Sequence, residues 1–228
     1  MRAMILAAGR GERMRPLTDH TPKPLLLVGG KPLIVWHIER LARAGFTELV
    51  INHAHLGQQI EAALRDGAQW QVHIRYSAEP QALETAGGIA NALPLLGDEP
   101  FLVVNGDVFT DIDYASLHLP AGKLAHLVMV DNPPQHASGD FGLENGLVIE
   151  SAGHRLTFSG VGVYHPELFD SVPPGQAAKL APLLKAAMQQ QRVTGQHHLG
   201  LWHDIGTAER LEQLDHWLQI RGNNEATL

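Results

Sequence analysis

The residues best suited to chemistry lie near the start of the chain, in the segment LAAGRGERMRPLTDHTPKPLL that runs from Leu6 to Leu26. Its two glycines, Gly9 and Gly11, would let a phosphate group approach the backbone N–H groups closely. Fixed cations would neutralise the charge of that group. The segment holds four of them: Arg10, Arg13, Arg15 and Lys23. Its prolines and glycines, and the lack of a helical apolar period, predict an ordered loop that binds a polyphosphate.

Two familiar phosphate-binding motifs do not match this loop. A P-loop requires a glycine followed by Lys and Ser or Thr, and the dinucleotide motif requires a glycine where this chain has Met14. An ordinary strand-to-helix turn would explain the glycines but not the cations. Residues 1–31 carry a formal charge of +4, whereas the whole chain carries −7, so the remainder carries −11. This asymmetry favours the anion-binding interpretation.

Two aspartates are expected at the ends of strands. Asp107 follows the apolar segment Phe101–Asn105, and Asp204 lies in the segment WHDIGT after a short apolar strand. In open α/β sheets, ligands bind at the carboxyl ends of strands. Asp107 alone could be part of a polar turn. Two such carboxylates beside a cationic loop indicate Mg²⁺, which takes one or two protein carboxylates and completes its shell with substrate phosphates and water.

Composition narrows the function further. The net charge of −7 and the absence of a basic stripe beyond the first loop argue against a nucleic-acid partner. No segment has the length and apolarity of a membrane span, and none of the residues is cysteine, so we expect a cytoplasmic protein without disulfides. The fourteen histidines lack the spacing of a zinc site and are expected on the surface. Trp36, Trp202 and Trp217 are expected in the core.

The apolar pattern alternates strands with helices through the first half of the chain, which predicts an α/β fold with a doubly wound, mostly parallel sheet. Strands are expected over Met4–Leu6, Glu48–Asn52, Trp70–Tyr76 and Phe101–Asn105, and helices over Pro32–Ala44, Gly57–Leu64 and Thr85–Leu93. Beyond about residue 120 the pattern predicts a smaller β extension with few helices, over Leu124–Val130, Leu147–Glu150 and Leu156–Tyr164, and a closing helix over Ala208–Ile220. We expect one domain, residues 1–228, with two functional halves, residues 1–120 and residues 121–228.

The motifs together resemble those of the sugar-1-phosphate nucleotidylyltransferase family. Its opening pattern, Leu-Ala-x-Gly-x-Gly-Thr/Ser-Arg-Leu/Met-x-Pro followed by Pro-Lys-Pro, is met from Leu6 to Pro24 except that Glu12 replaces Thr or Ser. The segment LETAGG resembles the family's Leu-Gly-Thr-Ala-Gly turn, with Glu84 in place of the first glycine. The resemblance covers nearly the whole chain and implies a Rossmann-like nucleotide-diphospho-sugar transferase fold, with a nucleotide-binding half (1–120) and a sugar-binding half (121–228).

The resemblance also implies roles for individual residues. It makes Arg13 and Lys23 the catalytic cations and Asp107 and Asp204 the ligands of a Mg²⁺ cofactor. It implies a nucleotide site formed by Leu6, Ala8, Gly9, Gly11, Glu12, Arg13, Lys23, Glu79, Thr85, Ala86 and Gly87. It implies a sugar site formed by Asn105, Asp140, Gly142 and Glu150. Ser151 stands where the family has a lysine that binds the sugar phosphate, and Arg155 is a possible replacement.

The implied reaction joins two small molecules, a nucleoside triphosphate and a sugar 1-phosphate, in a monomer or small homo-oligomer. The resemblance favours UTP and N-acetylmuramic acid 1-phosphate, in the recycling of cell-wall sugars. A carboxylate at Glu79 could accept N–H groups from either uracil or guanine, so the residues themselves leave the base open. The alternatives are a mannose- or heptose-1-phosphate guanylyltransferase, and a non-catalytic protein that binds sugar nucleotides and regulates a partner.

Overall fold

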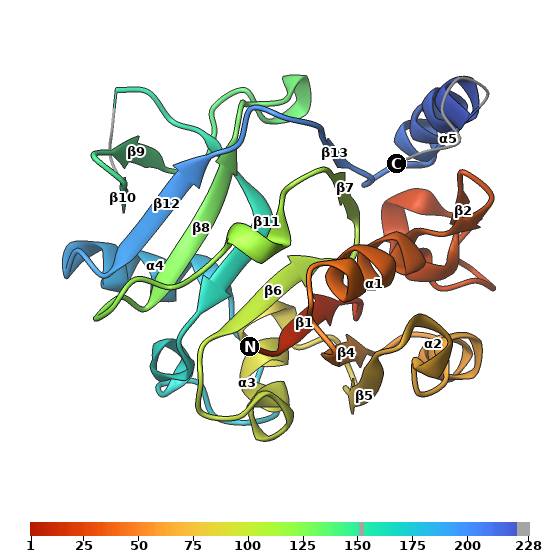
Figure 1. Cartoon of the computed structure of the whole chain (residues 1–228), viewed down its shortest axis with the longest axis horizontal. Coiled ribbons are helices and arrows are strands. Elements are labelled where there is room, and N and C mark those ends of the chain that lie inside the picture. The colour runs from red at the N-terminus through yellow and green to blue at the C-terminus, as the bar shows by residue number, and fades with distance from the viewer. Residues whose placement is uncertain (151–152, 223–228) are drawn as a thin grey trace.

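A single twisted sheet forms the centre of the molecule (Figure 1). The computed structural model describes residues 1–150 and 153–222. Within these residues, nine strands pair in the order β5-β4-β1-β6-β11-β8-β12-β10-β9. Their bounds are β1 Ala3–Leu6, β4 Glu48–His53, β5 His73–Ala78, β6 Phe101–Asn105, β8 Ala125–Val130, β9 Gly142–Glu144, β10 Leu147–Ile149, β11 Thr157–Tyr164 and β12 Val193–His197.

The direction of the strands changes at β11. Strands β5, β4, β1 and β6 are all parallel, whereas β11 runs antiparallel to both β6 and β8. Beyond it, β12 is parallel to β8, and β10 and β9 are antiparallel to their neighbours. The predicted α/β class is therefore confirmed. The strands after residue 120 extend the same sheet, because β11 inserts between β6 and β8.

Five α-helices accompany the sheet in the described part of the chain: α1 Leu33–Arg43, α2 Gly57–Leu64, α3 Glu84–Leu96, α4 Leu180–Gln189 and α5 Ala208–Gly222. Helix α1 starts directly after Pro32, whose extended backbone and missing N–H suit the position before the first turn. Gly45, with φ +88°, follows its last residues, where a left-handed conformation commonly ends a helix. None of the described helices combines the length and hydropathy needed to cross a bilayer.

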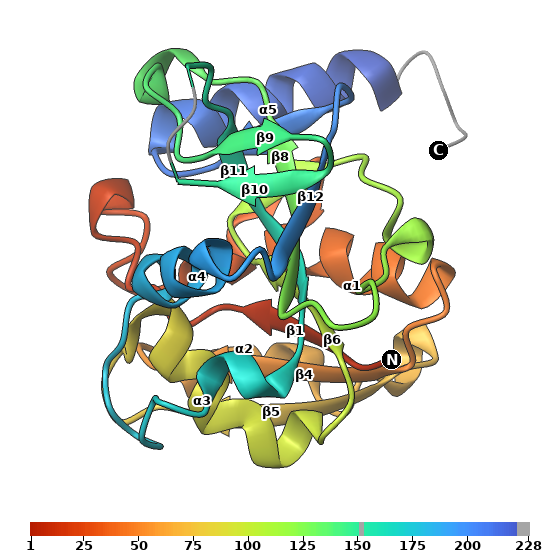
Figure 2. The ribbon, with the colours of Figure 1, turned by 90° about the vertical axis from the view of Figure 1, so that its left-hand side faces the viewer.

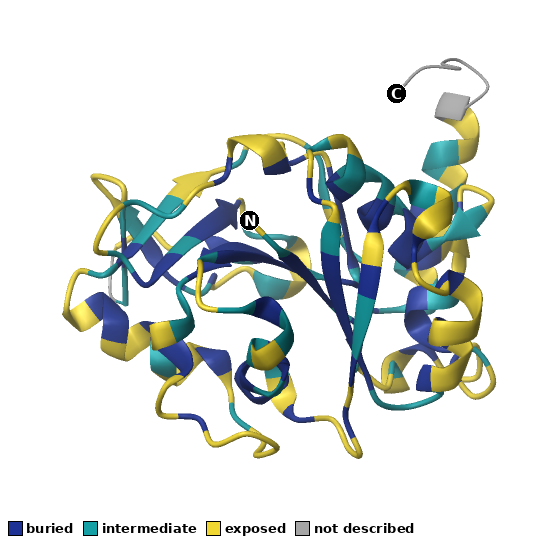
Figure 3. Cartoon of the chain, turned by 60° about the horizontal axis from the view of Figure 1, so that its bottom comes forward, coloured by how far each residue is buried: buried dark blue, intermediate teal, exposed yellow. Residues whose placement is uncertain are grey.

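Helices cover both faces of the sheet, as its alternating side chains require. On β1, Met4 packs with residues of α3 and α4, whereas Ala3 and Ile5 pack with residues of α1 and α2. Figure 2 shows α4 on one side of the strands and α1 on the other. The central strands are buried, while the outer faces of the helices are exposed (Figure 3). This burial fixes the register of β1 and β6, and so the positions of the loops that follow them.

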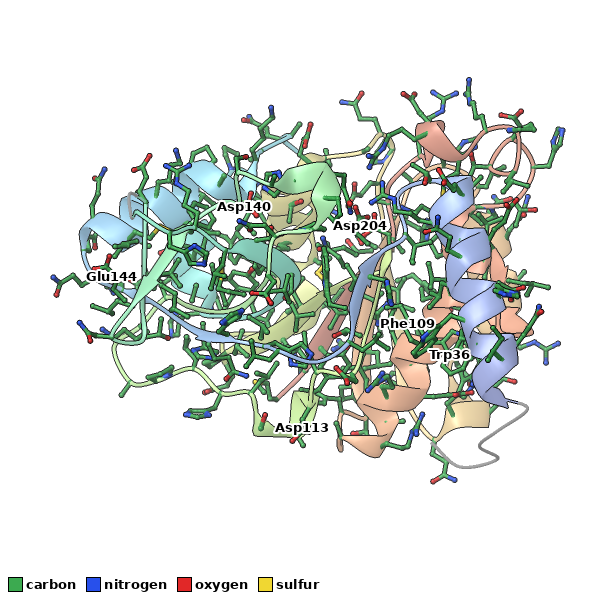
Figure 4. The ribbon with its side chains drawn as sticks, turned by 90° about the horizontal axis from the view of Figure 1, so that it is seen from above. Trp36, Phe109, Asp113, Asp140, Glu144 and Asp204 are labelled. Atoms are coloured by element: carbon green, nitrogen blue, oxygen red, sulfur yellow. The ribbon has the colours of Figure 1, made fainter. Side chains whose placement is uncertain are left out.

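A third, smaller core attaches the C-terminal helix. Helix α5 packs with the two-stranded sheet formed by β2 (Leu27–Val28) and β3 (Lys31–Pro32), and Gly29 N donates a hydrogen bond of 2.7 Å to Asp215 Oδ1. Trp36 and Phe109 meet edge to face beside α5, with ring centroids 5.3 Å apart (Figure 4). The expectation that Trp36 packs in the core is confirmed, because it contacts this cluster.

Three expectations need correction. The segment 68–70 forms a 3₁₀ turn, so β5 begins at His73 rather than Trp70; left-handed backbone at Gly67 and Gln71 flanks that turn. Helix α4 and strand β12 were not predicted, because Pro182 interrupts the apolar pattern of the helix and β12 buries a single residue, Val193. Two histidines, His37 and His53, are buried rather than on the surface.

Candidate active site

The cationic loop begins where β1 ends and is held in shape by its own residues. Gly11 has φ +68°, and a Cβ atom there would lie 2.9 Å from Thr18 Cγ2 and 3.2 Å from Lys23 Cβ. Only glycine satisfies both conditions. Thr18 is buried, and its hydroxyl donates a hydrogen bond of 2.9 Å to the Gly11 carbonyl. The predicted ordered loop is thus a closed structure in which Gly11 and Lys23 touch, although they are far apart along the loop.

Lys23 is almost completely buried, with 8% of its surface exposed, which is unusual for a lysine. It lies in the 3₁₀ helix η2 (Lys23–Leu25) between two prolines. Its Nζ atom donates a hydrogen bond of 2.7 Å to Asp107 Oδ2. The pair joins the cationic loop to the end of β6, so the two segments singled out in the sequence meet at one place.

The two predicted metal-binding aspartates are brought together by a short antiparallel pair of strands, β7 (Val108–Thr110) and β13 (Trp202–Asp204). Asp204 faces Val108 across this ladder, and Ile205 N donates a hydrogen bond of 2.8 Å to the Asp107 carbonyl. In Figure 1 the two strands lie side by side between the main sheet and α5. Helix α1 supports β7, because Arg40 donates a hydrogen bond to the Thr110 carbonyl.

Asp204 has a second partner that the sequence did not reveal. Arg210, in the first turn of α5, forms an ion pair with Asp204 Oδ2. Seen from above, Asp204 lies between Asp140 and helix α5 (Figure 4). The two aspartates thus form separate ion pairs, Asp107 with Lys23 and Asp204 with Arg210.

The other end of the site centres on Glu79, which is 5% exposed. Asn52 Nδ2 donates a hydrogen bond of 2.7 Å to Glu79 Oε1, and Leu83 N donates one of 2.9 Å to Oε2. Asn52 Oδ1 in turn accepts a hydrogen bond of 2.8 Å from Ala7 N. Asn52 thus links the beginning of the cationic loop to Glu79, and Glu79 holds the turn that precedes α3.

Glu84 shows why the family motif has glycine at its position. Its φ is +59°, in the left-handed region that costs a non-glycine residue about 1 kcal/mol or more. Its exposed side chain lines the site. A carboxylate in the first turn of a helix also interacts favourably with the helix dipole, which offsets part of this cost.

These segments enclose a cavity of about 530 Å³. Of the residues singled out in the sequence, it is lined by Leu6, Ala8, Gly9, Gly11, Glu12, Arg13, Lys23, Glu79, Thr85, Asn105 and Asp107. It is also lined by Ala7, Asn52, Gly106 and Gly206. The cavity thus has cations and an aspartate at one end and a hydrogen-bonded carboxylate at the other, which suits a ligand with a phosphate chain and a polar ring.

Two residues predicted for the nucleotide site lie beneath the cavity surface. Ala86 and Gly87 are buried, and their backbone N–H groups donate hydrogen bonds of 2.9 and 3.1 Å to the Ala178 carbonyl. A Cβ atom at Gly87 would lie 2.3 Å from the Gln176 carbonyl oxygen. Their small size lets the segment before α4 pack against α3, so these two N–H groups already have partners.

The predicted sugar residues other than Asn105 lie outside this cavity. Asp140 accepts hydrogen bonds on both oxygens, from His136 at 2.9 Å and from Phe158 N at 2.8 Å. Gly142 is buried in β9. Glu150 forms an ion pair of 2.6 Å with Lys185 of α4.

Two positions were considered for the contact to the sugar phosphate, Ser151 and Arg155. Ser151 lies outside the described residues. Arg155 is exposed; its backbone carbonyl accepts a hydrogen bond of 2.9 Å from Asn132 Nδ2, and its side chain forms no ion pair with a described residue. Asn105 lies where the cavity meets the second half of the chain, because it contacts Gly160 of β11. A Cβ atom at Gly160 would lie 2.6 Å from Asn105 Nδ2. The sugar assignments therefore stay predictions.

The donor set suits a magnesium ion. The described residues contain no cluster of three or more His, Asp or Glu side chains that could hold a metal on its own. Asp107, directly before β7, and Asp204, in β13, supply two carboxylates beside the cationic loop. Mg²⁺ typically takes one or two protein carboxylates and completes its shell with substrate phosphates and water. Asp107 and Asp204 could therefore hold Mg²⁺ together with a bound triphosphate.

Comparison with known proteins points in the same direction. The model of the nucleotidyl transferase family matches residues 2–148. The chain is 60% identical to N-acetylmuramate alpha-1-phosphate uridylyltransferase of Neisseria meningitidis over 222 residues, which cover 93% of this chain and 96% of that protein. It is 36% identical to the protein of the same name from Caulobacter vibrioides, over 90% of this chain and 91% of that one.

A solved structure supports the fold independently. A crystal structure assigned as a glucose-1-phosphate thymidylyltransferase from Bacillus anthracis superimposes with a TM-score of 0.81 and covers 96% of this chain and 95% of that one. The sequence identity is only 21%, so this similarity concerns the arrangement of the chain.

Proposed function

Because this chain belongs to the nucleotidyl transferase family, we propose that it transfers a uridylyl group from UTP to N-acetylmuramic acid 1-phosphate and releases pyrophosphate. The observation that carries the reaction type is the meeting of Lys23, Arg13 and Asp107 at one end of a cavity large enough for a nucleotide. The relative from Neisseria meningitidis, whose name states this activity, supports the choice of substrates.

The reaction needs charge neutralisation more than proton transfer. An oxygen of the sugar phosphate attacks the α-phosphorus, a new P–O bond forms, and the bond from the α-phosphorus to the bridging oxygen breaks as pyrophosphate leaves. The nucleophile is already an anion, so no general base is required. The difficulty is to bring two polyanions together, since a phosphate monoester carries roughly −1.5 to −2. Lys23 and Arg13 would hold the triphosphate and stabilise the charge that develops on it.

A magnesium ion is part of this proposal. Asp107 and Asp204 would hold it, and when bound it supplies a Lewis acid that neutralises phosphate charge and orients the two substrates. Lys23 would keep Asp107 in place through its 2.7 Å contact. The β7–β13 ladder would keep the two carboxylates at a fixed separation.

The base end of the cavity supports a nucleotide with a ring N–H. Glu79 is fixed by Asn52 and Leu83, so it presents a preorganised acceptor rather than a mobile one. Preorganisation of this kind lowers the cost of binding. Both oxygens of Glu79 already accept one hydrogen bond each, but a carboxylate has about four lone-pair sites, so a further donor can be accommodated.

A glycine lies beside the end of the cavity proposed for the sugar. Gly160 of β11 lies next to Asn105, the predicted sugar residue that lines the cavity, and the Asn105 amide occupies the space that a Cβ atom at Gly160 would need. Glycine at position 160 therefore lets the Asn105 side chain pack against β11, beside the place proposed for the sugar. The proposal also places the protein in the cytoplasm, where nucleoside triphosphates are available.

The experiment is a matrix of pyrophosphate-release assays, with UTP, GTP, dTTP and ATP against N-acetylmuramic acid, N-acetylglucosamine, glucose and mannose 1-phosphates. We expect UTP with N-acetylmuramic acid 1-phosphate to have the highest kcat/KM. Asp107→Asn is the control for contaminating activity and should be nearly inactive, because an amide cannot replace the charge of the carboxylate.

The possible outcomes separate the alternatives. A preference of about tenfold or more for GTP or for a neutral sugar phosphate, which corresponds to about 1.4 kcal/mol in transition-state binding, would replace the uridylyltransferase by another member of the family. Absence of pyrophosphate release from every pair, with nucleotide binding retained, would favour the non-catalytic sugar-nucleotide-binding protein.

A further inference from the structure

Arg210 occupies an unfavourable position for a cation. It is the third residue of α5, whose first turn carries the positive end of the helix dipole. A cation there is destabilising unless an anion compensates it. The ion pair with Asp204 Oδ2 provides one anion. Thr207 Oγ1 also accepts hydrogen bonds of 3.3 Å from both Arg210 N and Nε, so the side chain is held against the loop that precedes the helix.

A second guanidinium reaches the same place. A Cβ atom at Gly206 would lie 2.8 Å from Arg210 Nη2, 3.0 Å from Arg13 Nη2 and 3.1 Å from Asp204 Oδ1. Gly206 and Arg13 both line the cavity. The two guanidinium groups therefore converge beside Gly206, where Asp204 forms its ion pair with Arg210. Among the described residues Arg13 forms no ion pair, so its positive charge is available to an anionic ligand in the cavity.

The ion pairs at this end of the cavity can be replaced by contacts to a metal ion and a triphosphate. Asp107 is paired with Lys23, and Asp204 is paired with Arg210 beside Gly206, which lines the cavity. A hard divalent cation such as Mg²⁺ prefers oxygen ligands, among them the carboxylate of Asp204. Guanidinium groups bind phosphate with paired, charge-assisted hydrogen bonds. If the metal and the triphosphate arrive together, each group gains the partner that it prefers.

We propose that Arg210 exchanges partners during substrate binding. In the free protein it holds Asp204, and when a divalent metal binds Asp204 the guanidinium group turns to the phosphates of the nucleotide. The inference rests on the proposed function, since it requires a metal and a nucleoside triphosphate in this cavity. It assigns Arg210 as a further nucleotide-binding residue, and it couples the start of helix α5 to the arrival of the metal.

The test measures metal and nucleotide binding separately, in the full-length wild type, Arg210→Gln and Arg210→Lys. Electron paramagnetic resonance of free Mn²⁺ gives the affinity for bare metal without nucleotide. Isothermal titration calorimetry gives the affinity for UTP in the presence of saturating Mn²⁺. Arg43→Gln is the matched control, because Arg43 is exposed on α1 and its removal changes the net charge equally.

If Arg210 exchanges partners, removing its charge should change the affinities for Mn²⁺ and for UTP in opposite directions. Arg210→Gln should bind bare Mn²⁺ about threefold or more tightly than the wild type, because a competing positive charge is gone. The same variant should bind UTP about tenfold or more weakly, because a charge-assisted contact to phosphate is lost. Arg210→Lys should bind Mn²⁺ about as the wild type does but UTP more weakly, since it keeps the charge and loses the paired geometry. Arg43→Gln should change neither affinity.

Other outcomes overturn the inference. If Arg210→Gln weakens both affinities, Arg210 only braces Asp204. If neither affinity changes while wild-type turnover and metal binding are intact, Arg210 has no role at the site, and the proposed function stands without it. If the wild type binds no Mn²⁺, the metal assignment fails and the exchange fails with it.

Discussion

Lys23 is the residue whose position is hardest to explain except by function. Burying a lysine beside a single carboxylate stabilises a fold little, because the loss of hydration offsets most of the attraction. The pair with Asp107 therefore favours a role in binding or catalysis. Its neighbours Pro22 and Pro24 restrict the backbone, so the ammonium group is held in place before a substrate arrives.

Lys23→Ala should lower kcat about 100-fold or more while it raises KM for UTP by less than about tenfold, because charge that develops in the transition state loses its cation. Steady-state kinetics measures both values. Lys123→Ala, which removes a lysine outside the cavity whose Nζ donates a hydrogen bond to the Gln191 carbonyl, controls for the loss of one positive charge. A kcat within a few fold of the wild type would contradict the role of Lys23, provided that circular dichroism shows a folded variant.

Asn52 is the second residue whose substitution is informative. Asn52→Asp keeps the acceptor for Ala7 N but loses the donor to Glu79 Oε1, and places a carboxylate against a buried carboxylate. Like charges at this distance raise the pKa of one member of the pair. The KM for UTP should therefore rise about tenfold or more at pH 8 and recover as the pH falls and a proton is shared.

The measurement for Asn52 is KM for UTP between pH 5.5 and pH 8, beside Asn91→Asp as the control. Asn91 lies on α3 and donates a hydrogen bond of 3.1 Å to Ser77 Oγ, outside the cavity. An equal change of KM at every pH would mean that Asn52 has only a structural role.

The sequence could predict the residues that belong to local motifs. Arg13 and Lys23 lie in one continuous pattern, and Asp107 directly follows an apolar strand, so each is visible without the fold. Asn52 and Arg210 could not be found in this way. The side-chain contacts of Asn52 come from Ala7, directly after β1, and from Glu79, directly after β5. Asparagine at a strand end is also typical of an ordinary turn. For Arg210 a signal existed: a cation in the first turn of a predicted helix indicates a specific anion.

At the scale of elements, helix α1 determines where β7, and so Asp107, lies. His37 of α1 is buried, and its Nδ1 lies 3.4 Å from the Tyr114 hydroxyl. Burial lowers the pKa of His37 to about 4. The loss of hydration outweighs the hydrogen bond to the Val108 backbone and the charge of Asp107, both of which raise this pKa. The imidazole is therefore neutral in the folded protein at neutral pH, whereas in the unfolded chain it titrates near 6.5.

This difference predicts a pH dependence of stability. Between about pH 6.5 and about pH 4 the unfolded chain binds a proton that the folded protein does not, so stability falls as the pH falls through this window. Above it, the contribution of His37 is constant. His37→Gln should remove about 3 kcal/mol of this acid destabilisation, by the free-energy equivalent of the pKa shift. Urea unfolding at several pH values measures it, with His20→Gln, an exposed histidine, as the control. Parallel curves for wild type and His37→Gln would contradict the prediction.

Elements were predictable where their apolar period is regular and not where tertiary contacts replace it. Strand β6 and helix α2 were predicted with their observed bounds. The residues of β6 are almost all apolar, and the buried residues of α2 recur every three or four positions. Strand β12 has the sequence VTGQH, which resembles a loop, and it is a strand because β8 offers a parallel partner over five residues. Strand β7 is similarly short and is fixed by β13, nearly a hundred residues away in the chain.

At the scale of the whole molecule, the two halves share one core. Met4 and Val103 of the first half pack in the same cluster as Leu127, Tyr164 and Leu184 of the second. Strand β11 forms hydrogen bonds to β6 on one side and to β8 on the other, so neither half can separate without exposing a central strand edge. From this arrangement we expect the two halves to unfold together.

Unfolding should therefore occur in one transition. The fluorescence of the tryptophans near α5 and the far-ultraviolet circular dichroism of the whole chain should report the same midpoint, because coincident probes are the mark of a two-state transition. Mg²⁺ and UTP would bind the folded protein and not the unfolded chain. Adding them should therefore raise the fluorescence midpoint and the circular-dichroism midpoint equally, by an amount that grows with the logarithm of the UTP concentration. Trp36 and Trp217 flank Phe109, so this fluorescence is sensitive to the attachment of α5. An earlier transition seen by fluorescence alone would show that α5 detaches before the sheet unfolds, and a shift confined to that first transition would mean that the nucleotide binds through α5 rather than through the whole fold.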